Sequence, residues 1–320
     1  MNENFCYSCD VVCKAELVFN GHIEDECISF CCENYTGVPK LKISDTCEKT
    51  ISSIFELRNK MVDAGKKMLS NCMTDEDAEL LKGCLKCPRF SIHKYPIDNK
   101  IHFINLSLYP SPCQSSCIYC EFRKNKKMIN SSNQCLKNYG LLFDIIIRLR
   151  NNDYIATDIA WQISCGEITI HPLKKQILNL VKGEPVIFCT NGFRYDSDIS
   201  SIISDRTDNM INVSIDCGTE KTWEKVKKSG NLSMVTKTIK KYLQFCNPSQ
   251  IIVKYIFIPG VNDNIEDYIG IINILHELGI TKLVITPDFE SEHIEEDLKS
   301  ASVFQELLKK NEITYEVFLY

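Results

Sequence analysis

No basic block interrupts this sequence, and its 320 residues carry a formal net charge of −5. A protein that binds nucleic acid usually presents a cluster of lysine and arginine side chains. The N-terminus, MNENFCYSCD, lacks the apolar core of a secretory signal peptide. No apolar run reaches the length that spans a bilayer. We therefore expect a cytoplasmic protein with neither a nucleic-acid partner nor a membrane partner.

Cysteine, in contrast, is abundant: the chain contains 18, far more than packing requires. Disulfides need an oxidising compartment, and no export signal is visible, so clustered cysteines here favour metal binding. Ten cysteines precede residue 90, three form a tight triplet, and five occur singly afterwards. The N-terminal cysteines and the triplet therefore need separate explanations.

From about residue 100 onward, short apolar runs alternate with longer amphipathic stretches. The short runs are β-branched and apolar on both faces, as buried parallel strands are. They predict strands at 102–108, 159–164, 185–190, 210–215, 251–258 and 282–287, with helices near 138–150, 172–182, 231–246 and 265–278. This alternation predicts an α/β fold, a partial (β/α)6 TIM-like barrel over residues 98–320. The C-terminal segment ITYEVFLY is expected to add an edge strand.

Residues 1–97 break this rhythm and are predicted to form a small, cysteine-rich domain. They contain short segments and one convincing helix, over 52–69. Such a region cannot build a large apolar core, and a bound metal cluster is a common remedy.

The segment SPCQSSCIYC carries Cys113, Cys117 and Cys120 directly after the first barrel strand. Barrel active sites collect at the carboxyl ends of strands. A [4Fe–4S] cube is usually held by four thiolates, so three thiolates leave one iron open, as a catalytic metal site requires. The alternatives are an incidental group of buried cysteines and a zinc knuckle, whose fourth ligand would have to be Cys135 across a polar linker.

The spacing C-x₃-C-x₂-C, with Tyr119 before the last cysteine, resembles the signature of the radical S-adenosylmethionine (SAM) superfamily. The resemblance implies an enzyme in which the three cysteines hold a [4Fe–4S] cluster whose open iron binds SAM. One electron then cleaves SAM to methionine and a 5′-deoxyadenosyl radical, which removes a hydrogen atom from the substrate. An external one-electron donor, such as flavodoxin or ferredoxin, is the implied partner.

Further motifs follow in the order found in this superfamily. Ser164-Cys165-Gly166-Glu167 resembles a Gly-Gly-Glu motif, although cysteine replaces its first glycine, and Glu167 is the implied partner of the SAM ammonium. The resemblance further implies that Lys227 pairs with the SAM carboxylate. The cofactor-binding residues implied in this way are Tyr119, Gly166, Glu167, Asn191, Ser214, Asp216, Lys227, Ile256 and Ile258.

The N-terminal cysteines resemble the auxiliary-cluster modules called SPASM or twitch. In those modules a hairpin, a Cys-Cys pair, a helix and a C-x₂-C motif follow one another, usually after the barrel, whereas here they precede it. The resemblance implies an auxiliary [4Fe–4S] cluster on Cys13, Cys32, Cys84 and Cys87. Cys31 could replace Cys32, Cys6 and Cys9 could serve this cluster or a second one, and structural zinc on the same thiolates is the alternative.

Two substrate classes are compatible with this resemblance. Auxiliary-cluster modules recur in enzymes that cross-link, oxidise or epimerise peptide or protein residues. The alternative is dehydrogenation, deoxygenation or epimerisation of a sugar, a nucleotide or another small molecule. No cysteine-poor leader-binding domain precedes the barrel, which weakens the peptide hypothesis without removing it. A pure electron carrier is disfavoured, because such proteins close all four ligand positions of their clusters.

Overall fold

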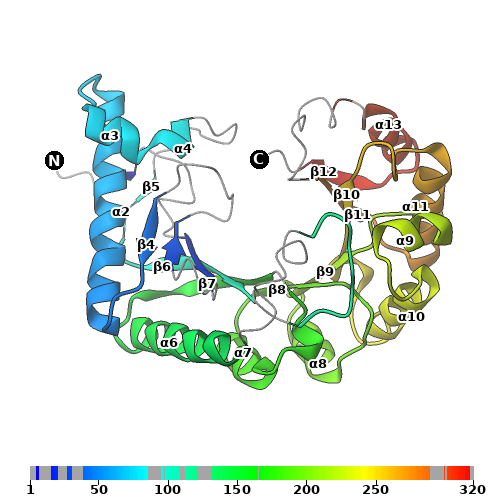
Figure 1. Ribbon diagram of the computed structural model, residues 1–320, viewed down its shortest axis with the longest axis horizontal. Coiled ribbons are helices and arrows are strands. Elements are labelled where there is room, and N and C mark those ends of the chain that lie inside the picture. Colours follow the sequence, from blue (N-terminus) through cyan, green and yellow to red (C-terminus); the bar gives the residue numbers. More distant parts are fainter. Residues whose placement is uncertain are drawn as a thin grey trace. The chain divides into compact units, whose positions relative to one another are not determined.

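Figure 1 shows the computed structural model, which describes residues 5–6, 16–20, 27–30, 39–85, 95–96, 98–108, 112–120, 132–164, 166–288, 299 and 301–317. The chain divides into two compact units. The first comprises Met1–Pro110, Ser131–Gln162 and Tyr320, and the second comprises Ser111–Asn130 and Ile163–Leu319. The cysteine triplet and all the implied SAM contacts therefore belong to the second unit.

The sheet of the second unit consists of parallel strands that hydrogen-bond in chain order. Buried aliphatic and aromatic side chains, such as Val213, Val253 and Ile285, fill its core. Because the strands are parallel, their carboxyl ends lie along one edge, where the segments that follow them can meet. The described strands are β8 (Val186–Thr190), β9 (Met210–Ser214), β10 (Ile251–Phe257), β11 (Lys282–Pro287) and β12 (Thr314–Val317).

Amphipathic helices separate these strands along the chain. One face of α10 is buried through Leu232, Val235, Ile239 and Tyr242, the spacing of a helix that packs on one side. The side chain of Asn231 caps this helix by accepting the Met234 N–H at 2.8 Å. The helices are α7 (Lys174–Val181), α8 (Ser197–Asp205), α9 (Glu220–Val226), α10 (Leu232–Tyr242), α11 (Ile265–Leu278) and α13 (Ser302–Lys310).

The first unit combines helices with a mixed sheet. Strand β2 pairs in parallel with β6, and β3 pairs antiparallel with both β2 and β4. The fully buried Arg58 of α2 donates to the carbonyl oxygen of Asp98 at 2.6 Å, which ties this helix to the segment before β6. The elements are β1 (Phe5–Cys6), β2 (Glu16–Asn20), β3 (Cys27–Ser29), β4 (Lys40–Lys42), α2 (Cys47–Leu69), α3 (Asp75–Leu80), α4 (Lys82–Leu85), β5 (Tyr95–Pro96), β6 (Ile101–Ser107), α6 (Ser132–Asn151) and β7 (Ile155–Ser164).

The structure confirms the predicted α/β class and the strands expected from the sequence, from β6 to the edge strand β12. The four barrel helices expected from their periodicity are present as α6, α7, α10 and α11. The sequence analysis missed α8, α9 and α13, which span seven to nine residues and carry only a short apolar repeat. The boundary at residue 97 stays a prediction about functional modules, since packing groups β6, α6 and most of β7 with the N-terminal segments.

Within the described part of the chain, no helix is both long enough and apolar enough to cross a lipid bilayer.

Candidate functional site

The cysteine loop, residues 112–120, is fastened to the C-terminal end of α9 by backbone hydrogen bonds. The N–H of Ser116 donates to the carbonyl oxygen of Lys227 at 3.0 Å, and that of Ile118 donates to Val226 at 2.9 Å. A turn inside the loop is closed by the Cys120 N–H, which donates to the Cys117 carbonyl at 3.2 Å. These contacts fix the backbone that presents the triplet.

All three thiols of the triplet are half-buried and none is in a disulfide. Ser115 Oγ lies 2.9 Å from Cys117 Sγ, and Asn191 Nδ2 donates to Cys113 Sγ at 3.5 Å. Burial raises the pKa of the Cys113 thiol, so a metal that binds there has to displace its proton. Hydrogen bonds to cluster sulfurs are one of the means by which proteins tune iron–sulfur centres.

This donor set fits an iron–sulfur cube. Among the described residues, no three His, Cys, Asp or Glu side chains surround one point as the ligands of a single ion would. The thiolates of a cube each bind a different iron, so they do not have to converge on one point. As ligands of such a cluster, Cys113, Cys117 and Cys120 remain predictions.

A buried ion pair lies directly behind the cysteine loop. Lys227 Nζ pairs with Asp216 Oδ2, and both side chains are fully buried. Tyr119 joins the pair, since its hydroxyl donates to Asp216 Oδ2 at 2.6 Å and accepts from Lys227 Nζ at 2.8 Å. The second carboxylate oxygen of Asp216 accepts the Ile256 N–H at 2.7 Å. This network joins the cysteine loop, the end of β9, the end of α9 and strand β10.

Electrostatics keeps the Lys227 ammonium charged. Burial alone would lower the pKa of Lys227, but the adjacent Asp216 carboxylate outweighs it and holds that pKa above its ordinary value. Burial, together with the charge of Asp216, raises the pKa of the Tyr119 hydroxyl well above its usual range. The phenol therefore stays protonated and can donate to Asp216.

Glu167, after the end of β7, is the second fully buried carboxylate of the site. Its Oε1 accepts from the N–H and the hydroxyl of Thr169, at 3.1 and 2.8 Å. The Thr190 hydroxyl lies 2.9 and 3.0 Å from its two oxygens, and the Asn191 N–H donates to Oε2 at 2.8 Å. Burial raises the pKa of Glu167, and these hydrogen bonds oppose that rise. Glu167 thus joins the segment after β7 to the turn after β8.

The turn after β8 requires glycine at position 192. Gly192 has φ +72°, and an added Cβ would lie 2.7 Å from Val213 Cγ1 and 2.8 Å from Val235 Cγ1. The turn places Asn191 so that its side-chain amide reaches Cys113 Sγ and Gln114 Oε1, the latter at 3.3 Å. The turn Thr190-Asn191-Gly192 and the cysteine triplet are therefore in contact through Asn191 and Cys113.

The structure brings most of the implied cofactor residues together in the second unit. Ile256 and Ile258 are buried with Val226, and Ile118 and Tyr119 pack against them. Ser214 is half-buried at the end of β9. Gly166 has φ +69°, which suits glycine. The charged atoms of Asp216 and Lys227 face each other and the Tyr119 hydroxyl. As contacts of SAM, all the implied cofactor residues remain predictions.

Few of the remaining candidate cysteines can be placed. Cys84 is buried in α4, whereas Cys13, Cys32 and Cys87 lie outside the described residues, as do Cys9, Cys31 and Cys165. Of Cys6 only the backbone, in β1, is described. The auxiliary cluster therefore stays a prediction.

Asn262 is a site residue that the sequence analysis did not assign. It is fully buried, and its Nδ2 donates to the carbonyl oxygens of Asp216 and Ile256 at 2.8 and 2.7 Å. Its Oδ1 accepts the Ile258 N–H at 2.7 Å. A polar residue soon after an apolar strand was the available signal, but only the fold shows that it bridges the ends of β9 and β10.

Comparison with known proteins establishes the fold. No family model matches the chain. A UPF0026 protein of Helicobacter pylori is 25% identical over 228 residues, which cover 66% of this chain and 72% of that protein. SuiB of Streptococcus suis bound to precursor peptide SuiA aligns over 100% of this chain and 72% of its own, with 12% identity and a TM-score of 0.53. A second SuiB structure aligns over 94% of this chain and 70% of its own, with 12% identity and a TM-score of 0.50. The chain therefore shares the fold of SuiB.

Proposed function

We propose that this protein is a radical SAM enzyme that uses one [4Fe–4S] cluster on Cys113, Cys117 and Cys120. The observation that carries the proposal is the cysteine loop, which is anchored on α9 and touched by Asn191 in a chain with this fold. When bound, the cluster supplies the electron that cleaves SAM to methionine and a 5′-deoxyadenosyl radical.

The residues of this chain have positioning roles in that reaction. The backbone of α9 holds the cysteine loop, and hydrogen bonds to Asp216 and Lys227 fix the position of Tyr119 in that loop. Glu167 holds the turn that carries Asn191, whose amide stabilises the Cys113 sulfur as a thiolate. SAM is assigned to the surroundings of Gly166, Glu167, Asn191, Ser214, Asp216, Lys227, Ile256 and Ile258.

A reconstituted enzyme, reduced without oxygen, tests the proposal. Dithionite should produce 5′-deoxyadenosine from SAM with the wild type and with the matched variant Cys246→Ala, which removes a half-buried cysteine elsewhere in the second unit. Cys117→Ala and the triple alanine variant of the triplet should produce none. Full activity in the triple variant would refute the proposal.

The proposed substrate is a peptide or protein residue that is cross-linked, oxidised or epimerised. Its support is the similarity to SuiB, which was solved with its precursor peptide. Short peptides encoded beside this gene, incubated with enzyme and SAM, should lose mass as hydrogen if they are cross-linked or oxidised. An epimerised peptide should keep its mass in H₂O and take up deuterium in D₂O. Turnover of a sugar or nucleotide instead, with no change in any such peptide, would assign the small-molecule class.

An auxiliary [4Fe–4S] cluster on Cys13, Cys32, Cys84 and Cys87 completes the proposal. Iron analysis should give about eight irons per chain, and about four after alanine replacement of the triplet, since each cube contains four irons. About four irons in the wild type, or zinc bound to these cysteines, would contradict the auxiliary cluster and leave the SAM chemistry intact.

A further inference from the structure

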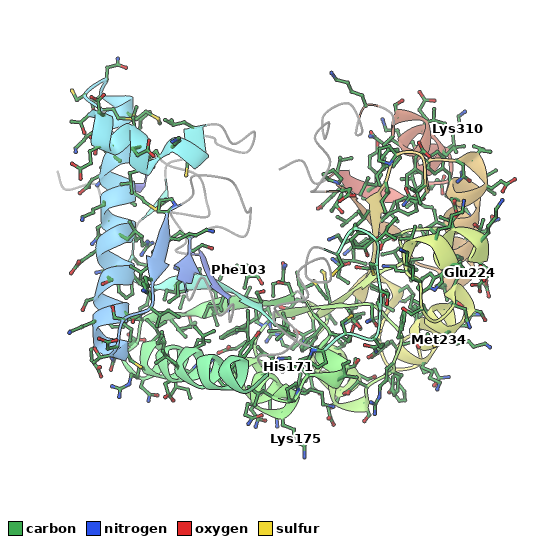
Figure 2. All side chains as sticks on the ribbon, in the orientation of Figure 1. Phe103, His171, Lys175, Glu224, Met234 and Lys310 are labelled. Carbon is green, nitrogen blue, oxygen red and sulfur yellow. The ribbon has the colours of Figure 1, made fainter. Side chains whose placement is uncertain are left out.

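A cationic cavity lies in the second unit, next to the turn that carries Asn191. Its volume is about 580 Å³, within the range of ligand-binding pockets. One wall is formed by Phe193, Arg194 and Tyr195, which follow the Thr190-Asn191-Gly192 turn. The other wall is the face of α10 that carries Met234, Lys237 and Lys241. Figure 2 labels Met234 on this helix.

The three cations of this cavity are not used to stabilise the fold. Arg194, Lys237 and Lys241 are exposed, and no acidic residue lines the cavity. None of the three forms an ion pair with a described residue, whereas Lys240, on the same helix, pairs with Glu277. In a chain whose net charge is −5, this free positive charge is concentrated at one place. Concentrated charge of one sign attracts partners of the opposite sign and raises their association rate.

The cavity wall is connected to the proposed cluster ligand by two hydrogen bonds. The N–H of Phe193 donates to Asn191 Oδ1 at 2.9 Å. The Nδ2 of Asn191 in turn donates to Cys113 Sγ at 3.5 Å. The Asn191 side chain thus links Phe193, which lines the cavity, to the proposed cluster ligand Cys113.

We infer that this cavity is the docking site for the acidic face of a protein that carries one electron at a time. The inference rests on the proposed function, which consumes one electron from outside for each SAM cleaved. In the step concerned, the reduced carrier loses one electron and the oxidised cluster gains it, and no bond or proton is transferred. Charge complementarity selects the carrier, and the Phe193–Asn191–Cys113 connection provides the short route inward.

The test compares two double variants of equal charge change. Lys237→Glu/Lys241→Glu reverses the cavity, and Lys175→Glu/Lys310→Glu reverses two exposed lysines on α7 and α13, which Figure 2 labels. The probe is a plant-type [2Fe–2S] ferredoxin. Its dissociation constant for the reconstituted protein, at several salt concentrations, measures docking, and stopped-flow absorbance with reduced ferredoxin measures cluster reduction.

The cavity variant should bind ferredoxin at least tenfold more weakly than wild type, and its cluster should be reduced at least tenfold more slowly. The control should match wild type, and wild-type binding should weaken steeply with salt. Dithionite should reduce the cluster in all three proteins at equal rates, since a small reductant needs no docking site. If the glutamate variant unfolds, Lys237→Gln/Lys241→Gln replaces it, with a smaller loss expected.

Equal ferredoxin binding by the two double variants would overturn the inference, as would a cavity that binds inorganic pyrophosphate tightly while ferredoxin binds elsewhere. Failure of dithionite to support SAM cleavage in the wild type would instead refute the proposed function. The two failures are therefore distinguishable.

Discussion

Glu167 and Asp216 are both fully buried carboxylates near the ends of strands, but they are stabilised in different ways. The described hydrogen-bond donors to Glu167 include two threonine hydroxyls and two backbone N–H groups, all of them neutral. Asp216 faces an ammonium, a phenol and one backbone N–H. A carboxylate with neutral donors tolerates the loss of one donor, whereas one member of a buried ion pair does not tolerate the loss of the other. Three substitutions test this difference and a fourth tests a buried base, His171, from the largest expected effect to the smallest.

Lys227→Met should lower the free energy of unfolding by about 3–5 kcal/mol, because it leaves Asp216 buried without its cation. Urea denaturation measures the change, and Lys225→Met, an exposed position on α9, is the control. The double variant Asp216→Asn/Lys227→Met should be more stable than Lys227→Met alone. If Lys227→Met costs less than about 1 kcal/mol, the pair does not stabilise the loop.

Acid should destabilise the region after β7 through His171. Its Nδ1 accepts the Leu173 N–H at 3.2 Å, and burial lowers its pKa from 6.5 to about 4. Folding therefore favours the neutral ring. The contribution of His171 to the free energy of unfolding is fully present above pH 6.5 and is lost as the pH falls from 6.5 towards 4. The loss should reach about 3 kcal/mol below pH 4. Unfolding curves at several pH values should show that His171→Gln lacks this component; an identical pH dependence in the variant would contradict the assignment.

Glu167→Gln should cost about 1–3 kcal/mol, because the amide NH₂ cannot accept the hydrogen bonds that one carboxylate oxygen accepts. SAM affinity measured by equilibrium dialysis distinguishes two roles. If Glu167 also faces the SAM ammonium, affinity should fall about ten- to a hundredfold, since charge-assisted hydrogen bonds are the stronger kind. If the loss is confined to stability, Glu167 is a positioning residue only. Glu184→Gln, away from this network, is the control.

The comparison also shows what the sequence could predict. The positions of the strands and of the cysteine loop followed from local periodicity and spacing, because each depends on a few consecutive residues. The pairing of Lys227 with Asp216 and Tyr119 did not, since 11 and 108 positions separate Lys227 from these partners. For the same reason a chain without a basic block holds a cationic cavity: Arg194 comes from the turn after β8, and Lys237 and Lys241 come from α10. Folding, and not sequence proximity, brings these groups together.

Tyr119→Phe gives the smallest expected change and separates packing from hydrogen bonding at the Asp216 pair. The variant keeps the ring that packs against Ile256 and Ile258 and removes only the hydroxyl. Lys227 and Asp216 still compensate each other, so the cost should be about 0.5–1.5 kcal/mol, the net value of an ordinary hydrogen bond. Tyr119→Leu, which also removes the ring, should cost more, and urea denaturation of both variants measures the two contributions. Cluster content should stay at the wild-type level in Tyr119→Phe, because the backbone bonds from Ser116 and Ile118 to α9 still hold the loop. A loss in Tyr119→Phe as large as that in Lys227→Met would show that the phenol is a required third member of the ion pair.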